Sequence, residues 1–259
     1  MIGIEDLSLS VPGKTLFKHF SADIQAGERI GIFGPNGAGK STFLKALLGL
    51  VKPAQGRIHI QQRQLAYLPQ EMDPIAADYS VEGFLKAVLR GARWGLPLIG
   101  AVGHEIEAAL QKVDALNLQH QLFKNLSGGE RKRVMLAAIL LENPSILLLD
   151  EPLANLDPYF QKELLHLIDQ LQQRLKLTIL ITAHDFNPLL PLLDRVMFIG
   201  KERAVLDTPA QVINTETLSQ LYQTPWEVVE LKGRKWVLAG DQQVFLQTEH
   251  CHGGACVSV

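Results

Sequence analysis

Residues 34–42 are Gly34-Pro35-Asn36-Gly37-Ala38-Gly39-Lys40-Ser41-Thr42, a complete G-x-x-x-x-G-K-[ST] loop. The loop lies between an apolar run at 30–33 and a helical pattern at 43–48. This order predicts a phosphate-binding loop, in which backbone N–H groups and the positive helix N-terminus face phosphate oxygens. We expect Lys40 to reach the β- and γ-phosphates and Ser41 to hold Mg²⁺. The alternative is a glycine-rich turn that only caps a helix.

The composition indicates a globular protein. Its 259 residues carry a formal net charge of -2. Charges of both signs are interspersed, so the sequence lacks the basic stripe that is typical of nucleic-acid binding. Glu5 and Asp6 stand where a secretion signal would be basic, and no apolar run approaches the ~20 residues that span a bilayer. We therefore expect a cytoplasmic chain whose role at a membrane, if any, comes through a partner.

The two cysteines, Cys251 and Cys256, both lie near the end of the sequence. In a reducing cytosol we expect them to be free thiols or metal ligands rather than a disulfide. Together with His250 and His252 they form a candidate metal site, whose soft and borderline ligands favour zinc or copper(I) over manganese. The alternative is a disordered tail with incidental cysteines, because chain ends are usually mobile.

Two kinds of strand are predicted. Alternating apolar and polar residues at 1–33 are typical of antiparallel strands with one wet face, and two more short strands are predicted at 57–60 and 64–68. A short apolar run at 145–149 predicts a parallel strand that is buried on both faces, and 177–182 and 195–199 are predicted as a second and a third buried strand. Segments 227–231 and 235–238 are predicted to form a terminal hairpin.

Helical patterns occur between and after these strands. Ser80 can cap a helix at 81–89, and the spacing of Ile106, Leu110 and Val113 predicts a second helix after a loop at 91–103. A long helix is predicted from Asp157-Pro158, and two short helices from 208–209 and 215. We predict an α/β fold: a P-loop NTPase core with a parallel sheet, an N-terminal antiparallel β subdomain, and a helical subdomain inserted at about 73–135.

Three side chains follow the parallel strands at the sheet edge where ligands bind in open parallel sheets. Asp150 and Glu151 end one strand, and His184 follows the next. Asp150 is suited to hold Mg²⁺ through its water shell, Glu151 to orient or deprotonate the attacking water, and His184 to donate toward the γ-phosphate. The alternatives are solvent-facing carboxylates and a purely structural histidine.

A second glycine motif, Leu126-Ser127-Gly128-Gly129-Glu130, precedes a helical pattern at 131–141. Ser127 and Glu130 form the capping box S-x-x-E, which alone could explain the motif. Two adjacent glycines are unnecessary for a cap, however, and they would leave backbone N–H groups open to an anion. One chain would then own two phosphate-binding helix ends, which suggests a nucleotide held between two chains.

With these motifs in this order, the sequence resembles ATP-binding cassette (ABC) ATPases, the motor subunits of ABC transporters, over about residues 1–220. The resemblance rests on six motifs: the Walker A loop 34–42, the glutamine-loop residue Gln70, the signature 126–130, Walker B 146–150 with Glu151, Asp157 of the D-loop and the switch residue His184. It implies ATP hydrolysis with Mg²⁺, and it leaves 221–259 as a C-terminal hairpin and tail. The implied catalytic residues are Lys40, Gln70, Glu151 and His184, and the implied Mg²⁺ site is Ser41, Gln70 and Asp150.

The resemblance also implies a head-to-tail homodimer. Each ATP would lie between the Walker A loop of one chain and Ser127, Gly128, Gly129 and Asp157 of the other. Val11 falls where the family has an aromatic residue that stacks on adenine, so only an aliphatic contact is expected, unless another aromatic such as Phe17 serves. Glu130 replaces a commoner glutamine and keeps the capping function.

Segments 182–188, 193–196, 208–209 and 218–222 are similar to those of ATPases from bacterial zinc and manganese importers. This implies permease subunits in the membrane, an extracytoplasmic metal-binding protein, and a position on the inner face of the cell membrane. A groove between Gln70 and the helices at 80–120 would receive a permease helix. Importers of iron chelates are an alternative, and a soluble ABC ATPase or a simple P-loop switch fits the sequence less well.

Overall fold

The computed structural model describes residues 1–61, 64–70, 78–92, 102–222, 225–231 and 234–239. A six-stranded sheet lies at its centre. In spatial order its strands are β5 (Leu65–Leu68), β6 (Ile146–Leu149), β7 (Thr178–Thr182), β3 (Arg29–Phe33), β8 (Arg195–Gly200) and β9 (Arg203–Asp207). Every neighbouring pair is parallel except β8 and β9. The predicted fold class, with its parallel sheet, is confirmed.

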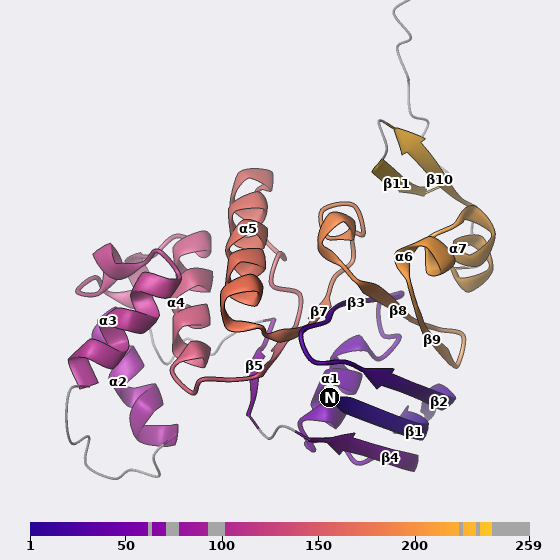
Figure 1. Cartoon of the computed structure of the whole chain (residues 1–259), viewed down its shortest axis with the longest axis horizontal. Coiled ribbons are helices and arrows are strands. Elements are labelled where there is room, and N and C mark those ends of the chain that lie inside the picture. The colour runs from indigo at the N-terminus through magenta and orange to yellow at the C-terminus, as the bar shows by residue number, and fades with distance from the viewer. Residues whose placement is uncertain (62–63, 71–77, 93–101, 223–224, 232–233, 240–259) are drawn as a thin grey trace, which may run out of the picture.

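A second, antiparallel sheet places β1 (Ile2–Val11) between β2 (Lys14–Ile24) and β4 (Gln55–Ile60) (Figure 1). The prediction of antiparallel strands at 1–33 is therefore right for β1 and β2 and wrong for β3, which pairs in parallel with β7 and β8. The residues of β3 from Ile30 to Phe33 are all buried, which is typical of a parallel strand covered on both faces. The short edge strand β9 was not predicted.

Successive residues of the central strands belong to two different cores. On β6, Ile146 and Leu148 join a core shared with the antiparallel sheet and with α1 (Lys40–Leu47). Leu147 and Leu149 join the core formed with the helices on the other face. Because side chains alternate between the faces of a sheet, a strand with two covered faces needs an uninterrupted apolar run.

The helices between β5 and β6 lie at one end of the molecule (Figure 1). They are α2 (Val81–Ala92), α3 (Val102–Lys112), η2 (Leu116–Leu118), η3 (Phe123–Asn125) and α4 (Gly128–Leu140). Ser80 Oγ accepts a hydrogen bond from Gly83 N at 3.1 Å, so the predicted cap is confirmed. Ile106, Leu110 and Val113 are fully buried, as their spacing predicts. Of the loop predicted at 91–103, residues 93–101 lie outside the described residues.

The remaining elements follow the central strands. They are α5 (Pro158–Leu175), η4 (Leu190–Leu192), α6 (Pro209–Val212), α7 (Thr215–Tyr222), β10 (Trp226–Leu231) and β11 (Arg234–Ala239). Asp157 caps α5, since its Oδ1 accepts a hydrogen bond from Phe160 N at 3.0 Å. β10 and β11 pair as the predicted hairpin, which lies beside α7 (Figure 1).

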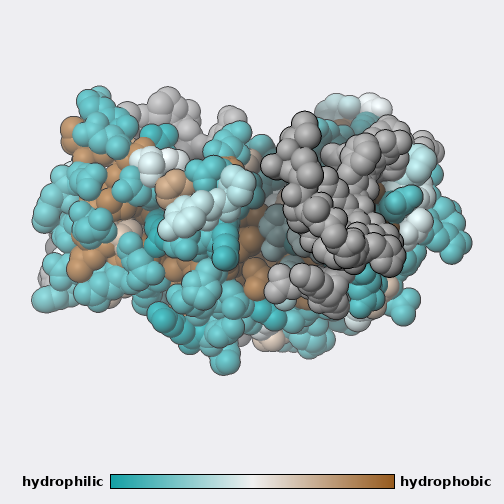
Figure 2. Space-filling model, turned by 90° about the horizontal axis from the view of Figure 1, so that it is seen from above, coloured by the Kyte–Doolittle hydropathy of each residue, from teal (hydrophilic) through white to brown (hydrophobic). Residues whose placement is uncertain are grey.

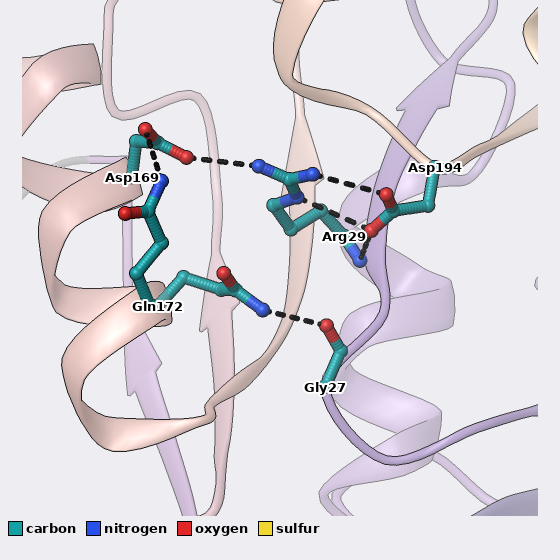
Figure 3. Close-up of polar contacts among 6 residues, drawn as sticks. Gly27, Arg29, Asp169, Gln172 and Asp194 are labelled. Carbon is teal, nitrogen blue, oxygen red and sulfur yellow. Dashed lines mark hydrogen bonds and ion pairs between the residues drawn. The ribbon is translucent and has the colours of Figure 1, made fainter.

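Arg29 holds together the end of the central sheet that lies away from the phosphate loop (Figure 3). Its guanidinium donates to both oxygens of Asp194, at 3.0 and 3.2 Å, and to Asp169 of α5 at 2.8 Å. Gln172 of α5 adds a 2.7 Å bond to the carbonyl oxygen of Gly27. The hydrogen bond to Asp194 raises the pKa of Arg29. Partial burial raises the pKa of Asp194, but its bonds to Arg29 outweigh this effect and leave the pKa below its ordinary value.

Candidate functional site

A cavity of about 500 Å³ lies where the phosphate loop meets the ends of β6 and β7. It brings together ten of the residues that the sequence predicts for the site, from segments up to 173 positions apart (184 minus 11). Its lining consists of Val11, Leu16, Asn36, Gly37, Gly39, Lys40, Ser41, Thr42, Gln70, Glu151 and His184. This convergence supports the prediction that ligands bind at the carboxyl ends of the parallel strands.

The phosphate loop closes onto the side chain of its lysine. Lys40 Nζ donates to the carbonyl oxygens of Gly34, at 3.0 Å, and Pro35, at 3.4 Å, while Ala38 N bonds to Pro35 O at 3.1 Å. Gly39 precedes α1 with a φ of 107°, and a Cβ there would lie 2.7 Å from Leu16 Cδ1. The positive φ favours glycine at this position, and a side chain there would also have to displace Leu16.

Lys40 is a buried cation near two buried carboxylates. Burial lowers its pKa, and the negative charges of Glu151 and Asp150 oppose that shift. The whole Lys40 residue is only 5% exposed, so its ammonium group has little contact with solvent. Anionic phosphate oxygens in the cavity would take the place of solvent, because a buried charge is stable only when it is paired.

Three hydroxyl groups converge on the carboxylate of Asp150. Ser41 Oγ and Thr182 Oγ1 donate to Oδ1 at 3.0 and 2.7 Å, and Tyr67 OH donates to Oδ2 at 2.9 Å. Burial raises the pKa of Tyr67, and the charge of Asp150 raises it further, so the phenol stays a donor at neutral pH. Hydroxyl and carboxylate oxygens are ligands that suit Mg²⁺, so Ser41 and Asp150 fit the predicted metal.

Two loops hold the carboxylate of Glu151. His184 Nε2 lies 2.6 Å from its Oε1, and Gln70 Nε2 donates to its Oε2 at 2.8 Å. The backbone of Glu151 is in the left-handed region, with a φ of 46°, and its N–H donates to Thr182 Oγ1 at 2.8 Å. A non-glycine residue in this region is strained, and such strain is commonly found at functional sites.

Tyr67 and Thr182 were not singled out from the sequence as site residues. Both lie next to predicted ones: Tyr67 is three residues before Gln70, and Thr182 is two residues before His184. Thr182 is fully buried and bonds to both Asp150 and Glu151, so it fixes the two carboxylate residues relative to each other. A polar residue at the carboxyl end of a buried strand, directly before His184, is the signal that could have identified it.

The signature residues lie outside the cavity. Ser127 Oγ accepts from Glu130 N at 3.3 Å, and Glu130 Oε2 accepts from Ser127 N at 2.8 Å, so the capping box is confirmed. A Cβ on Gly129 would lie 2.7 Å from the ring of Phe160, so α5 packs closely on this helix end. Ser127, Gly128, Gly129 and Asp157 are not among the residues that line the cavity, and their contact with a nucleotide of a second chain stays a prediction.

The cavity offers aliphatic side chains where the family resemblance implies an adenine-stacking aromatic. Val11 lines the cavity and is 36% exposed, and Leu16 lies beside it. Phe17 is fully buried and packs edge-on against Phe20 and Phe43 in the core. Phe17 is therefore excluded as a substitute for the missing aromatic.

The predicted tail site of His250, Cys251, His252 and Cys256 lies outside the described residues. Within the described ranges, the structure shows no group of three or more His, Cys, Asp or Glu side chains placed to hold a metal ion. The helices in those same ranges include none with the length and apolar character needed to cross a membrane.

Comparison with known proteins shows the family. A model of the family described as ABC transporter matches residues 17–154. The chain belongs to the ABC transporter family. This ABC ATPase is 33% identical over 226 residues to the zinc import ATP-binding protein ZnuC of Buchnera aphidicola subsp. Schizaphis graminum, across 85% of this chain and 89% of the relative. The predicted family and its ATP-hydrolysing activity are confirmed.

Solved ABC structures share the fold of this ABC ATPase. One is cbiO1 from Clostridium perfringens, part of the ABC transporter complex cbiONQ, with 27% identity, a TM-score of 0.73 and coverage of 85% of this chain and 92% of that chain. Another is an ABC transporter in an inward-facing conformation, with 24% identity and a TM-score of 0.81 over 92% of this chain and 95% of that chain.

Proposed function

We propose that this ABC ATPase powers the import of a divalent metal ion, zinc or manganese, through a separate membrane permease. The likeness to a zinc import ATP-binding protein over 85% of the chain supports the substrate class. The observation that carries the catalytic part is the placement of Glu151 between Gln70 and His184 at the phosphate-loop cavity. Import of another substrate, such as an iron chelate, is the second candidate.

In the proposed reaction, Glu151 is the base that accepts a proton from the attacking water. Gln70 and His184 each contact one of its two carboxylate oxygens. Binding of ATP and Mg²⁺ beside Glu151 would therefore change the positions of both loops. Mg²⁺ bound with ATP would neutralise charge on the phosphates, with Ser41 and Asp150 as its protein ligands. Lys40 then leaves the loop carbonyls for the β- and γ-phosphates.

The proposed working form is a head-to-tail homodimer. The cavity holds the Walker A loop, Gln70, Glu151 and His184 but not the signature residues, which supports their use by a second chain. In this arrangement Ser127 and the two glycines after it would face the γ-phosphate across the interface. ATP would close the dimer and hydrolysis would reopen it.

The proposed permease contact lies between Gln70 and the helical region. Apolar surface appears among polar residues over this end of the molecule in Figure 2. Exposed large hydrophobic residues of this region include Tyr79, Leu116 and Leu122. We propose an ATPase domain at 1–220, a C-terminal part at 221–259, and a peripheral position on the inner face of the membrane. An extracytoplasmic metal-binding protein would deliver the ion to the permease.

Uptake of radioactive Zn²⁺, Mn²⁺ and an iron chelate, measured separately, tests this proposal in cells in which the chain is the only copy of its ATPase. Metal-limited cells with the wild-type chain are expected to accumulate one of the two ions. Cells with Glu151→Gln are expected to lose that uptake, because an amide cannot accept the proton. If the substitution abolishes only the uptake of an iron chelate, the second candidate is correct. Unchanged uptake of all three substrates would refute a role in their transport.

A further inference from the structure

The loop that carries His184 is hydrogen-bonded to the C-terminal hairpin through Asn187, which lies three residues after His184. Asn187 Oδ1 accepts a hydrogen bond from Val237 N at 2.8 Å, and Asn187 Nδ2 donates to Val237 O at 3.1 Å. One side-chain amide thus satisfies both backbone groups of a β11 residue, as a neighbouring strand would. Asp185 Oδ1 also accepts from Asn187 N at 2.9 Å, which orders the turn between His184 and Asn187.

Side chains anchor both outer edges of the hairpin. Val228 and Val237 lie opposite each other, and each directs backbone groups away from the hairpin. On the β10 side, Val228 N donates to Thr215 Oγ1 of α7 at 3.0 Å. Thr215 therefore joins the hairpin to its neighbouring helix, whereas Asn187 joins it to the loop of His184.

Aromatic packing makes a second connection between the hairpin and the nucleotide site. Phe186 lies between His184 and Asn187 in sequence, and its ring stacks on Phe33 at a centroid distance of 4.2 Å. Phe33 is the last residue of β3, directly before the phosphate loop. Phe186 also packs edge-on against Trp226, the first residue of β10, at a centroid distance of 6.2 Å.

Trp226 has a polar group that this packing leaves unsatisfied. Its indole Nε1 is buried and has no hydrogen-bond partner among the described residues. Buried donors without partners are rare and costly, so a shift that gave Nε1 an acceptor would be favourable. The ring packs tilted against Tyr222 at 4.6 Å and beside Phe186, and its fluorescence should therefore report movement of this loop.

We propose that Asn187 is a positioning residue for His184, and that the hairpin of β10 and β11 acts through it as a clamp on the switch loop. The proposal rests on the role proposed above for His184 in hydrolysis. Half of the His184 side chain is exposed, so packing around the imidazole alone does not fix its place beside Glu151. A displacement of about 1 Å in a catalytic group can cost on the order of 10²-fold in rate, so the anchor of its loop matters.

Asn187→Ala in the full-length chain tests the clamp. We expect kcat for ATP to fall about tenfold, with KM for ATP within about twofold of wild type, because Asn187 acts on the catalytic histidine rather than on ATP binding. Thr215→Ala is the matched control: it removes one anchor of the same hairpin but touches no site loop, and its kcat should stay within about twofold of wild type. Val237→Pro removes the N–H that donates to Asn187 Oδ1, and because this N–H points away from β10 the pairing of the hairpin does not depend on it. Its effect on kcat should be less than additive with that of Asn187→Ala.

The fluorescence of Trp226 gives a readout besides turnover. In a chain with Trp94→Phe and Trp236→Phe, Mg-ATP should shift the Trp226 emission, and Asn187→Ala should reduce this shift by at least about half. Wild-type kcat in Asn187→Ala, or an equal loss of kcat in Thr215→Ala, would overturn the proposal. If His184→Ala keeps wild-type turnover, the proposed role of His184 fails first, so the two failures are distinguishable.

Discussion

Thr182→Val tests whether one buried hydroxyl group holds both carboxylate residues of the site. The substitution keeps the shape of the side chain and removes Oγ1, which donates to Asp150 Oδ1 at 2.7 Å and accepts from Glu151 N at 2.8 Å. The change leaves a buried N–H without a partner, which costs about 1–3 kcal/mol, and removes a bond to a charged group worth about 1.5–3 kcal/mol. Since the added methyl group regains part of this loss, we expect about 2–4 kcal/mol of destabilisation. For a chain of this size that lowers Tm by about 5–15 °C.

The catalytic effect follows from the strained backbone of Glu151. A non-glycine residue in the left-handed region costs about 1–2 kcal/mol, and the bond from Glu151 N to Thr182 helps to hold it there. Without that bond the strained conformer loses population, and we expect kcat to fall about 10- to 100-fold, equivalent to about 1.4–2.7 kcal/mol. KM for ATP should change by less than about threefold, because Lys40 is untouched and Ser41 and Tyr67 still donate to Asp150.

Thr178→Val is the matched control for Thr182→Val. Thr178 begins the same strand, β7, is 3% exposed, and accepts a hydrogen bond from Gly27 N at 2.9 Å, at the end of the sheet away from the cavity. It should lower Tm and leave kcat unchanged, when ATPase activity is measured at least about 15 °C below each Tm. If Thr182→Val keeps the kcat of Thr178→Val, the hydroxyl group does not position Glu151 and the reasoning is refuted.

Three further predictions concern other parts of the chain. Glu151→Gln should bind ATP without turning it over and elute as a dimer in gel filtration with Mg-ATP, whereas a monomeric elution with bound ATP would contradict the proposed dimer. Arg29→Met should lower the free energy of unfolding in denaturant by about 1–3 kcal/mol at pH 7, since it breaks charged hydrogen bonds. Because the folded pKa of Asp194 lies below its ordinary 3.8, this stabilisation is complete above about pH 4 and is lost as the pH falls through the lowered pKa; a difference that grows in acid would contradict it. Val11→Tyr should tighten binding of a fluorescent ATP analogue at least about fivefold if it stacks on adenine at ~1–3 kcal/mol, and unchanged affinity would show that Val11 does not face the base.

Local patterns were sufficient to predict most of the elements. The Asp157 cap, the Ser127–Glu130 capping box and the apolar run of β6 each depend on residues close together in sequence, and each is found in the structure. β3 was assigned to the wrong kind of pairing because its five residues follow two antiparallel strands, and a run that short fits either environment. The pairing was decided by β7 and β8, about 150 positions later in the chain.

The polar contacts within the site were much less predictable. A motif identifies Asp150 and Glu151, but it does not show which hydroxyl groups reach them from other strands. Tyr67 and Asp150 are 83 positions apart, and they meet because β5 and β6 are paired so that Leu68 lies beside Leu149. Asn187 and Val237 likewise meet only because the hairpin folds back onto the core. Such contacts depend on register and side-chain direction, which local periodicity does not determine.

The two ends of the central sheet balance their charges in different ways. At one end, Arg29 pairs with two carboxylates, those of Asp169 and Asp194, so each of these charges has a partner within the chain. At the other end, Asp150 and Glu151 are 3% and 8% exposed, yet Asp150 is held by neutral hydroxyl groups and Lys40 bonds to loop carbonyls. Buried charges without a direct ion pair are less stable than paired ones, and Mg²⁺ and phosphate groups would supply direct partners for Asp150 and Lys40. Mg-ATP would pair the buried charges of the site, so binding of the nucleotide should stabilise the fold as well as start the reaction.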